Sequence, residues 1–213
     1  MNPSFKDLLY IHRLVVDRVR FSSRQHLNFS LINIIAVGFI FGIYEGHLPP
    51  PLLLCWIIGL IVVVLMEMSL YVTYLFYEST VSAEMWEQQV LFLNLLICLG
   101  IGGGIWFVAW SGSELFLPIT TVILLYAVAL YGMHLFNVRI FVVCLLGLLL
   151  PAVAFYALTD AQNNVFYMMA LILLGLMLSV FSVISAQYFQ SSNLNHYRAE
   201  ELTKKLAEEK AVS

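Results

Sequence analysis

The positions of the positive charges constrain this chain more than any other sequence feature. Of the ten Lys and Arg residues, five precede the first long apolar run, four follow the last one, and only Arg139 lies between apolar runs. Cationic residues that flank membrane spans tend to stay on the cytoplasmic side. The distribution therefore predicts a multi-pass protein of a bacterial inner membrane with both termini in the cytoplasm and an even number of spans.

The composition agrees with a membrane protein. The 213 residues are 62% hydrophobic and 11% charged, which leaves too little polar side chain to cover a soluble domain. A spanning helix needs about 20 mostly apolar residues. We therefore expect an all-α fold, a six-helix transmembrane bundle. The expected spans are 27–45, 52–77, 89–110, 116–136, 140–158 and 165–187.

The chain divides into three parts. Residues 1–26 mix apolar side chains with cations, which predicts an amphipathic cytoplasmic helix lying on the anionic inner leaflet. Residues 27–187 form the membrane domain, and residues 188–213 form a cytoplasmic linker helix. The connections between spans are too short to fold a periplasmic domain, so recognition is expected within the bilayer or at its rim.

A few polar side chains within the apolar runs are candidates for a signal or ligand pocket. Glu67 lies well inside the second span, where an acidic residue costs about 2.5–3.5 kcal/mol on insertion scales and so usually faces the bundle interior. It is either a ligand-contact or proton-responsive group, or a structural acid bonded to a neighbouring helix. Asn33 and Asn94 are amides that can join helices or contact a ligand. His134 lies near the inner end of the fourth span.

Other residue types point to packing. Gly38 with Gly42, and Gly100 with Gly104, are spaced four apart, which predicts close approach of helix backbones. The three cysteines lie in apolar runs without the spacing of metal ligands. No catalytic set or metal motif is present, so we expect no catalytic site, no metal and no cofactor in this chain. The apolar content also argues against nucleic-acid binding.

The C-terminal segment predicts a helix that leaves the membrane. Glu200 with Lys204, and Glu201 with Lys205, form i,i+4 pairs of the favoured polarity, and Ala199, Leu202 and Leu206 follow a spacing of three to four. The sixth span can therefore continue as one signalling helix. Since residues 210–213 contain no helix-ending glycine or proline, the sequence predicts that this helix leads into a missing output domain.

The residues 193–210 resemble the linker after the last span of bacterial membrane-bound hybrid sensor histidine kinases. The stretch Gly102 to Trp106, the pair Leu117 and Pro118, Arg139, and the stretch Leu149 to Pro151 are also similar to their six-span input regions. The resemblance covers residues 85–213. It implies a sensor domain of a homodimeric kinase that acts on a response regulator. His196 lacks the acid and proline that follow the phosphorylated histidine of those kinases, so the kinase activity itself would belong to the missing domain.

Three other functions remain open. Some membrane diguanylate cyclases carry similar input regions. A small carrier or channel could use Glu67 as a proton or cation site, and the chain could also be a structural subunit of an assembly. For a sensor, the short loops favour a small apolar or amphiphilic signal that arrives through the lipid bilayer.

Overall fold

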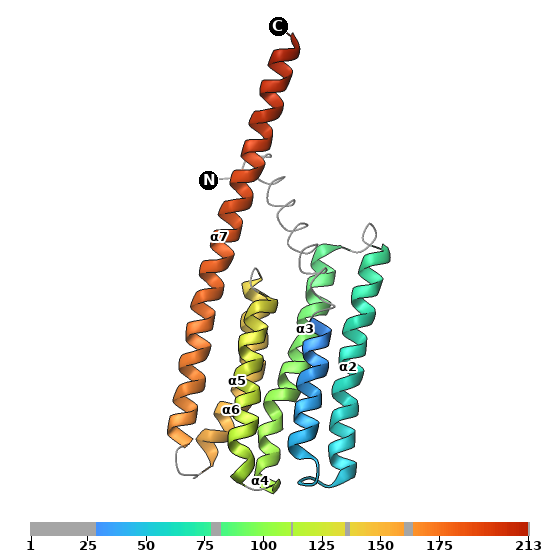
Figure 1. Cartoon of the computed structure of the whole chain (residues 1–213), viewed down its shortest axis with the longest axis vertical. Helices are drawn as coiled ribbons and strands as arrows, with labels where there is room; N and C mark the ends of the chain where they lie inside the picture. The colour runs from blue at the N-terminus through green and yellow to red at the C-terminus, as the bar shows by residue number, and fades with distance from the viewer. Residues whose placement is uncertain (1–28, 78–81, 112, 135–136, 160–163, 213) are drawn as a thin grey trace.

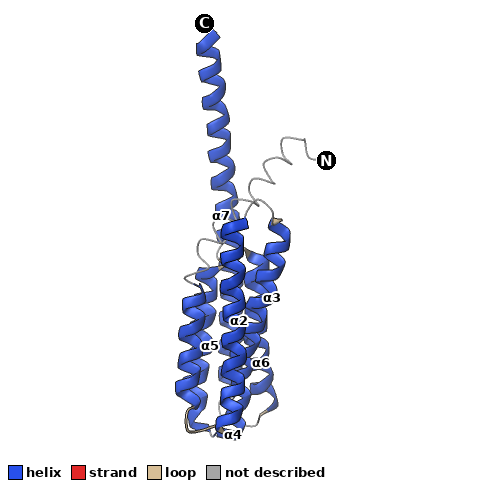
Figure 2. Ribbon diagram, turned by 90° about the vertical axis from the view of Figure 1, so that its right-hand side faces the viewer, coloured by secondary structure: helices blue, strands red, loops and turns tan. Residues whose placement is uncertain are grey.

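The computed structural model of the chain describes residues 29–77, 82–111, 113–134, 137–159 and 164–212. Within these ranges the chain is helical, with short turns and no strand (Figure 2). The helices run side by side in one bundle, and the last helix projects far beyond it (Figure 1). The all-α prediction is confirmed for this part of the chain. The amphipathic helix expected over residues 1–26 lies outside the described residues.

The bundle begins with the helix Phe29–Tyr44, which carries no label in Figure 1. The elements that follow are α2 (Pro50–Tyr77), α3 (Ala83–Gly103), the 3₁₀ turn η1 (Gly104–Phe107), α4 (Val108–Ser111), the 3₁₀ turn η2 (Ser113–Leu115), α5 (Phe116–Met133), α6 (Val138–Leu158) and α7 (Asn164–Val212).

Four of the helical stretches are long and apolar enough to cross a membrane, by length and composition. They are Pro50–Tyr74, Glu84–Phe107, Val138–Leu158 and Val165–Phe189. The helices Phe29–Tyr44 and Phe116–Gly132 are also apolar but shorter, between 10 and 17 residues. The six apolar stretches expected from the sequence are thus all helical, as four long helices and two short ones.

Two helix boundaries differ from the sequence expectation for identifiable reasons. The helix α3 begins at Ala83 rather than residue 89, because the Ser82 hydroxyl caps it by accepting from the Met85 N–H at 3.2 Å and Glu84 lies in its first turn. The helix α2 begins at Pro50, since proline is tolerated in the first turn, where its missing N–H would have no partner. The preceding turn contains Gly46 at a φ of 80°.

The contact between α3 and α6 forms the centre of the core. A Cβ added at Gly102 would lie 2.9 Å from the carbonyl carbon of Leu148, and one at Gly147 would lie 2.6 Å from the side chain of Leu95. At Gly102 only glycine permits this approach, because the overlap is with backbone, whereas at Gly147 the end of the Leu95 side chain would have to shift. The helix α6 runs through Pro151 without ending, and the indole N–H of Trp106 donates to the Pro151 carbonyl oxygen at 3.1 Å.

The two glycine pairs behave differently. Gly100 and Gly104 pack against α2, where an added Cβ would overlap the ends of the Leu60 and Trp56 side chains unless these shifted. An added Cβ at Gly38 or Gly42 would meet nothing within 4 Å. In the described part of the chain, Gly38 and Gly42 therefore make no close helix contact, and Gly38 lines a cavity between its helix and α2.

The helix α7 continues from the bundle as a single helix of 49 residues, as expected from the sequence. Within the bundle it contacts α5 through Tyr131 and Ser185, whose hydroxyl groups are 3.0 Å apart, and α6 through the stacked rings of Tyr156 and Tyr167, whose centroids are 5.5 Å apart. Beyond the bundle it projects as one continuous helix (Figure 1). The seam residues Ala199 and Leu202 are exposed, and the side chain of Leu206 is outside the described part.

Candidate functional site

Four polar side chains from four helices meet in the core, and we call them the Glu67 cluster. They are Asn33 on the helix Phe29–Tyr44, Glu67 on α2, Asn94 on α3 and Tyr126 on α5. Their exposed fractions are 0%, 1%, 0% and 3%, respectively. Three of them, Glu67, Asn33 and Asn94, are sequence candidates for a pocket, and the structure brings all three together.

The cluster is connected by direct hydrogen bonds. The Asn33 amide nitrogen donates to Glu67 Oε2 at 2.8 Å, and the Asn94 amide nitrogen donates to Glu67 Oε1 at 3.0 Å. The Tyr126 hydroxyl donates to Asn33 Oδ1 at 2.5 Å. Asn94 also donates to the Val90 carbonyl oxygen, one helical turn earlier, at 3.0 Å. Each of the two carboxylate oxygens thus accepts a hydrogen bond from a different helix.

The cluster has two consequences for the fold. A buried polar group is costly unless it is hydrogen-bonded, so the bonds that satisfy Glu67 also fix the positions of the first helix, α2 and α3 relative to one another. The buried Asn94 Oδ1, however, has no hydrogen-bond partner among the described residues. Buried polar atoms without partners are uncommon in native proteins, which makes this oxygen a candidate acceptor for a donor not yet present.

Two cysteines lie against the cluster. Cys98 on α3 and Cys144 on α6 are both fully buried free thiols, and Cys98 interacts with both Cys144 and Tyr126. The sequence expectation that these cysteines serve packing fits their position at the α3–α6 contact. Nowhere in the described ranges do three or more His, Cys, Asp or Glu side chains gather in a group that could hold a metal ion.

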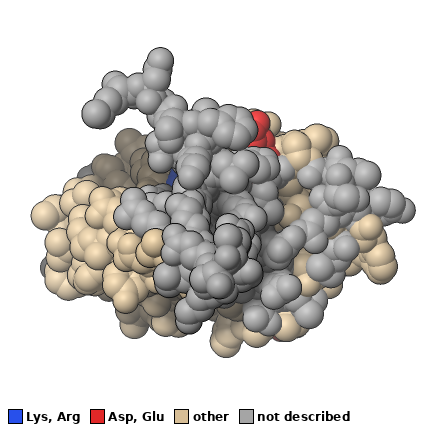
Figure 3. Space-filling view, turned by 90° about the horizontal axis from the view of Figure 1, so that it is seen from above, with Lys and Arg blue, Asp and Glu red and all other residues tan. Residues whose placement is uncertain are grey.

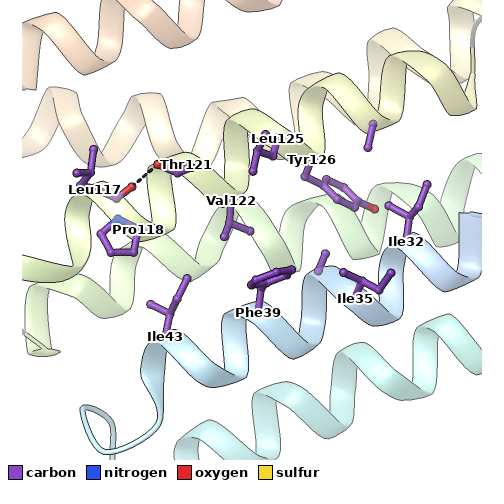
Figure 4. Close-up of a pocket in the computed structure, with 12 residues that line it drawn as sticks. Ile32, Ile35, Phe39, Ile43, Leu117, Pro118, Thr121, Val122, Leu125 and Tyr126 are labelled. Atoms are coloured by element: carbon purple, nitrogen blue, oxygen red, sulfur yellow. Dashed lines mark hydrogen bonds between the residues drawn. The ribbon is translucent and has the colours of Figure 1, made fainter.

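A crevice of about 520 Å³ separates the helix Phe29–Tyr44 from α5 (Figure 4). Its lining side chains are almost all apolar, and Tyr126 lies among them on the α5 side. Ile32, Ile35, Ala36, Phe39 and Ile43 line one wall, and Leu117, Pro118, Thr121, Val122, Leu125, Tyr126 and Ala129 line the other.

The polar atoms on the crevice walls are already bonded within the protein. The Thr121 hydroxyl donates to the Leu117 carbonyl oxygen at 2.8 Å (dashed in Figure 4), and the Tyr126 hydroxyl donates to Asn33. The outer wall residues Phe39 and Leu125 are 63% and 66% exposed, so the crevice opens sideways to the surroundings of the bundle. An apolar occupant is therefore the kind these walls accommodate. A smaller cavity of about 300 Å³ lies on the other side of the first helix, against α2.

His134 does not belong to the Glu67 cluster by position. It follows Tyr126 by eight residues, about 12 Å along α5, and it caps the end of that helix. Its ring lies 5.5 Å from the ring of Phe29. At the same end of the bundle, the Asn137 amide donates to Glu87 at 3.1 Å and so joins α6 to α3. Figure 3 looks onto this end, from which α7 projects. Most of the described residues left in view there are uncharged, with one acidic group and a small basic patch.

Sequence reasoning missed Tyr126. A tyrosine in an apolar run usually indicates packing, and nothing along α5 marks this one as the partner of an amide 93 residues earlier. The available signal was the presence of one hydrogen-bonding side chain deep within each of several runs.

Comparisons with protein-family models, with curated proteins and with solved structures find no match to this chain.

Proposed function

We propose that this chain is the signal-input domain of a membrane sensor that responds to an apolar or amphiphilic molecule in the bilayer. The observation that carries this proposal is α7, one helix that packs on α5 and α6 inside the bundle and continues well beyond it. Such a helix can convey a change of packing in the membrane to a domain outside it. Following the resemblance of residues 85–213, that domain is a histidine kinase of a homodimer that acts on a response regulator.

The helix α5 connects the crevice to α7. One face of α5 lines the crevice, and another contacts α7 at Tyr131 and Ser185. A molecule that wedges between the first helix and α5 would favour one position of α5 over another. A ligand shifts such an equilibrium only by its differential affinity for the two states, and the crevice offers that difference because its volume depends on how far the two helices are apart.

The shape of the crevice favours a single hydrocarbon chain as the ligand. Its walls extend over residues 32–43 and 117–129, which correspond to about 16–18 Å of helix. Dry apolar cavities bind apolar molecules. The Thr121 and Tyr126 hydroxyl groups already donate to atoms of the protein, so the crevice offers few polar groups to recognise a polar head.

The membrane arrangement belongs to the same proposal. Six crossings with both termini in the cytoplasm would put Arg139 and the cations of both terminal segments on one side. The two short helices would be accommodated by local thinning of the bilayer. Reporter fusions after positions 48, 83, 113, 138, 162 and 213 should then alternate between outside and inside, starting outside. A reporter that is active outside after position 213 would overturn this topology.

The phase of α7 provides the test of the sensor proposal. We would fuse the chain in helical register to the cytoplasmic part of a well-characterised histidine kinase and insert residues between Gln190 and Ser191. One inserted residue turns everything downstream by about 100°, whereas seven restore the phase to within about 20°. We expect the single insertion to lock or abolish kinase output and the seven-residue insertion to preserve it.

A control insertion of one residue in the turn at Gly46 leaves the phase of α7 unchanged and should leave the output responsive. If both insertions in α7 leave the output unaffected, α7 is a passive tether and the sensor proposal fails.

A carrier that uses Glu67 is the second candidate, because the Glu67 cluster buries a titratable carboxyl between four helices. The two functions differ in what Glu67→Gln changes. In a carrier, this variant would abolish pH-driven uptake by vesicles that contain the purified chain. In a sensor, such vesicles show no protein-dependent flux in either form, and the variant alters only the output of the fused kinase.

A further inference from the structure

The hydrogen bonds of the Glu67 cluster leave one position to be filled. Each Glu67 carboxylate oxygen accepts from an amide N–H, at 2.8 Å from Asn33 and at 3.0 Å from Asn94. An ionised carboxylate can only accept hydrogen bonds, so this arrangement matches the charged form. The same Asn94 amide carries the buried Oδ1 that has no partner in the described part of the chain. The cluster therefore holds an acceptor that lacks a donor, next to an acid that can become one.

We propose that Glu67 is a reversible proton-binding site and that the Asn94 amide turns to accept the bound proton. A proton on Oε1 makes the carboxyl an O–H donor, and a turn of the Asn94 amide by about 180° brings Oδ1 to the place that Nδ2 now occupies. Nδ2 gives up its bonds to Glu67 and to Val90. This inference does not rest on the sensor proposal and applies equally to a carrier.

The two forms differ in which atoms of Asn94 have partners. In the charged form, Asn94 Oδ1 has no hydrogen-bond partner among the described residues. In the neutral form the amide is turned, and Asn94 Nδ2 is then the atom without a partner. The number of unsatisfied groups of Asn94 is thus similar in both. Turning the amide costs the two hydrogen bonds of Nδ2. Protonation removes a buried charge, and a charge is more costly to keep in an apolar interior than an unpaired polar group. The charge of Glu67 and the orientation of the Asn94 amide are therefore linked.

The neighbouring titratable groups are Tyr126 on α5, Cys98 on α3 and Cys144 on α6, and Glu67 acts electrostatically on the first two. Carboxyl groups ordinarily release their proton at lower pH than thiols and phenols do. Asn33 and Asn94 do not titrate. The bound proton of the proposal is therefore assigned to Glu67, the carboxylic acid among these groups.

Protonation of Glu67 would also reach the crevice. Asn33 lies between Glu67 and Tyr126, with bonds of 2.8 Å and 2.5 Å to the two. A tyrosine hydroxyl both donates and accepts, so Asn33 keeps a partner whichever way its amide faces. Loss of the charge on Glu67 weakens the hydrogen bond from Asn33 to Oε2. Because Tyr126 lines the crevice, this change lies directly behind that wall.

Infrared difference spectroscopy tests the proposal on the full chain purified into lipid nanodiscs. As the pH falls, we expect the carbonyl stretching band of a protonated carboxyl to appear, to shift in heavy water, and to be absent from Glu67→Gln. The matched control is Glu87→Gln, since Glu87 also accepts from an asparagine amide, that of Asn137 at 3.1 Å, but lies near the end of the bundle. This control should keep the Glu67 band.

Asn94→Leu tests the role of the amide even if Glu67→Gln does not fold. The acid in this variant loses its acceptor, so its band should move to higher frequency. A titrating buried carboxyl that persists in Glu67→Gln, or an unchanged band frequency in Asn94→Leu, would overturn the proposal. A band that changes with sodium concentration at constant pH would indicate that Glu67 binds a metal ion rather than a proton, and it would also overturn the proposal.

Discussion

The contact between α3 and α6 and the surroundings of the helix Phe29–Tyr44 are built in opposite ways. The helices α3 and α6 touch through glycines, with the Gly102 position against the Leu148 backbone. The first helix is flanked by cavities of about 520 Å³ and 300 Å³. Polar bonds tie it to the rest, through Asn33 to Glu67 and Tyr126 and through the Tyr44 hydroxyl, which donates to the Gly104 carbonyl oxygen at 2.6 Å.

We call α3 and α6 the frame of the bundle, because their contact is rigid, whereas the first helix is an element that can shift. Close-packed contacts resist small displacements because any movement overlaps atoms. Hydrogen bonds at a few points, with apolar space on either side, allow a helix to move when those bonds exchange partners. The first helix is therefore the part of the described bundle best suited to respond to a ligand or to a proton, while α3 and α6 hold the reference position.

The largest expected effect comes from breaking the frame. Gly102→Ala places a methyl group into the backbone of Leu148, so α3 and α6 must separate, at a cost of about 3 kcal/mol or more by analogy with overpacked cores. Thermal unfolding in detergent, followed by circular dichroism, should show a clear fall in Tm. Gly103→Ala is the matched control, since an added Cβ there meets nothing within 4 Å. Equal Tm values for the two variants would contradict the close contact.

A smaller effect is expected from cutting the bond that joins the crevice to the Glu67 cluster. Tyr126→Phe removes the donor to Asn33 Oδ1 and leaves a buried oxygen unsatisfied, which costs about 1–3 kcal/mol. Chemical unfolding in mixed micelles measures this loss. Thr121→Val changes the polarity of the same wall but only removes a bond within α5, so it should cost less. A Tyr126→Phe variant as stable as the native chain would show that this bond is not formed.

Filling the crevice should hardly change stability but should abolish binding of a chain-like ligand. Ala129 lines the crevice, whereas Ala127 on the same helix is fully buried in the core. We expect Ala129→Phe to cost less than about 1 kcal/mol and to prevent cross-linking of a photoactivatable fatty acid to α5 in nanodiscs. Ala127→Phe should cost about 1–3 kcal/mol or more by overpacking. Undiminished cross-linking to α5 in Ala129→Phe would place the ligand elsewhere.

The smallest effect is expected at Gly38. Since a Cβ there meets nothing within 4 Å, Gly38→Ala should be neutral or should stabilise the helix by up to about 1 kcal/mol. Gly147→Ala, which meets Leu95, should destabilise. The expectation that Gly38 and Gly42 pack against a helix can still apply to a second copy of the chain. Loss of a dimer in Gly38→Ala, measured by light scattering in detergent, would support that role and contradict the neutral outcome.

The sequence predicted the helices well because long apolar runs leave few other folds. It also identified Glu67, Asn33 and Asn94, since a polar side chain deep in an apolar run must find a partner. It could not predict that these three meet, because that depends on the rotation of each helix about its own axis. Tyr126 and the roles of Gly102 and Gly147 were missed for the same reason, and the crevice arises from helices that do not touch, for which no residue pattern exists.

The length of α7 turns it into a lever. From Phe189, where its apolar stretch ends, to Val212 the helix extends by about 35 Å. If the part held by Tyr131 and Tyr156 tilts by about five degrees, the far end moves sideways by about 3 Å, which follows from the same rise per residue. A displacement at the crevice too small to break a hydrogen bond would thus be magnified at the other end of the helix to the size of a side-chain contact.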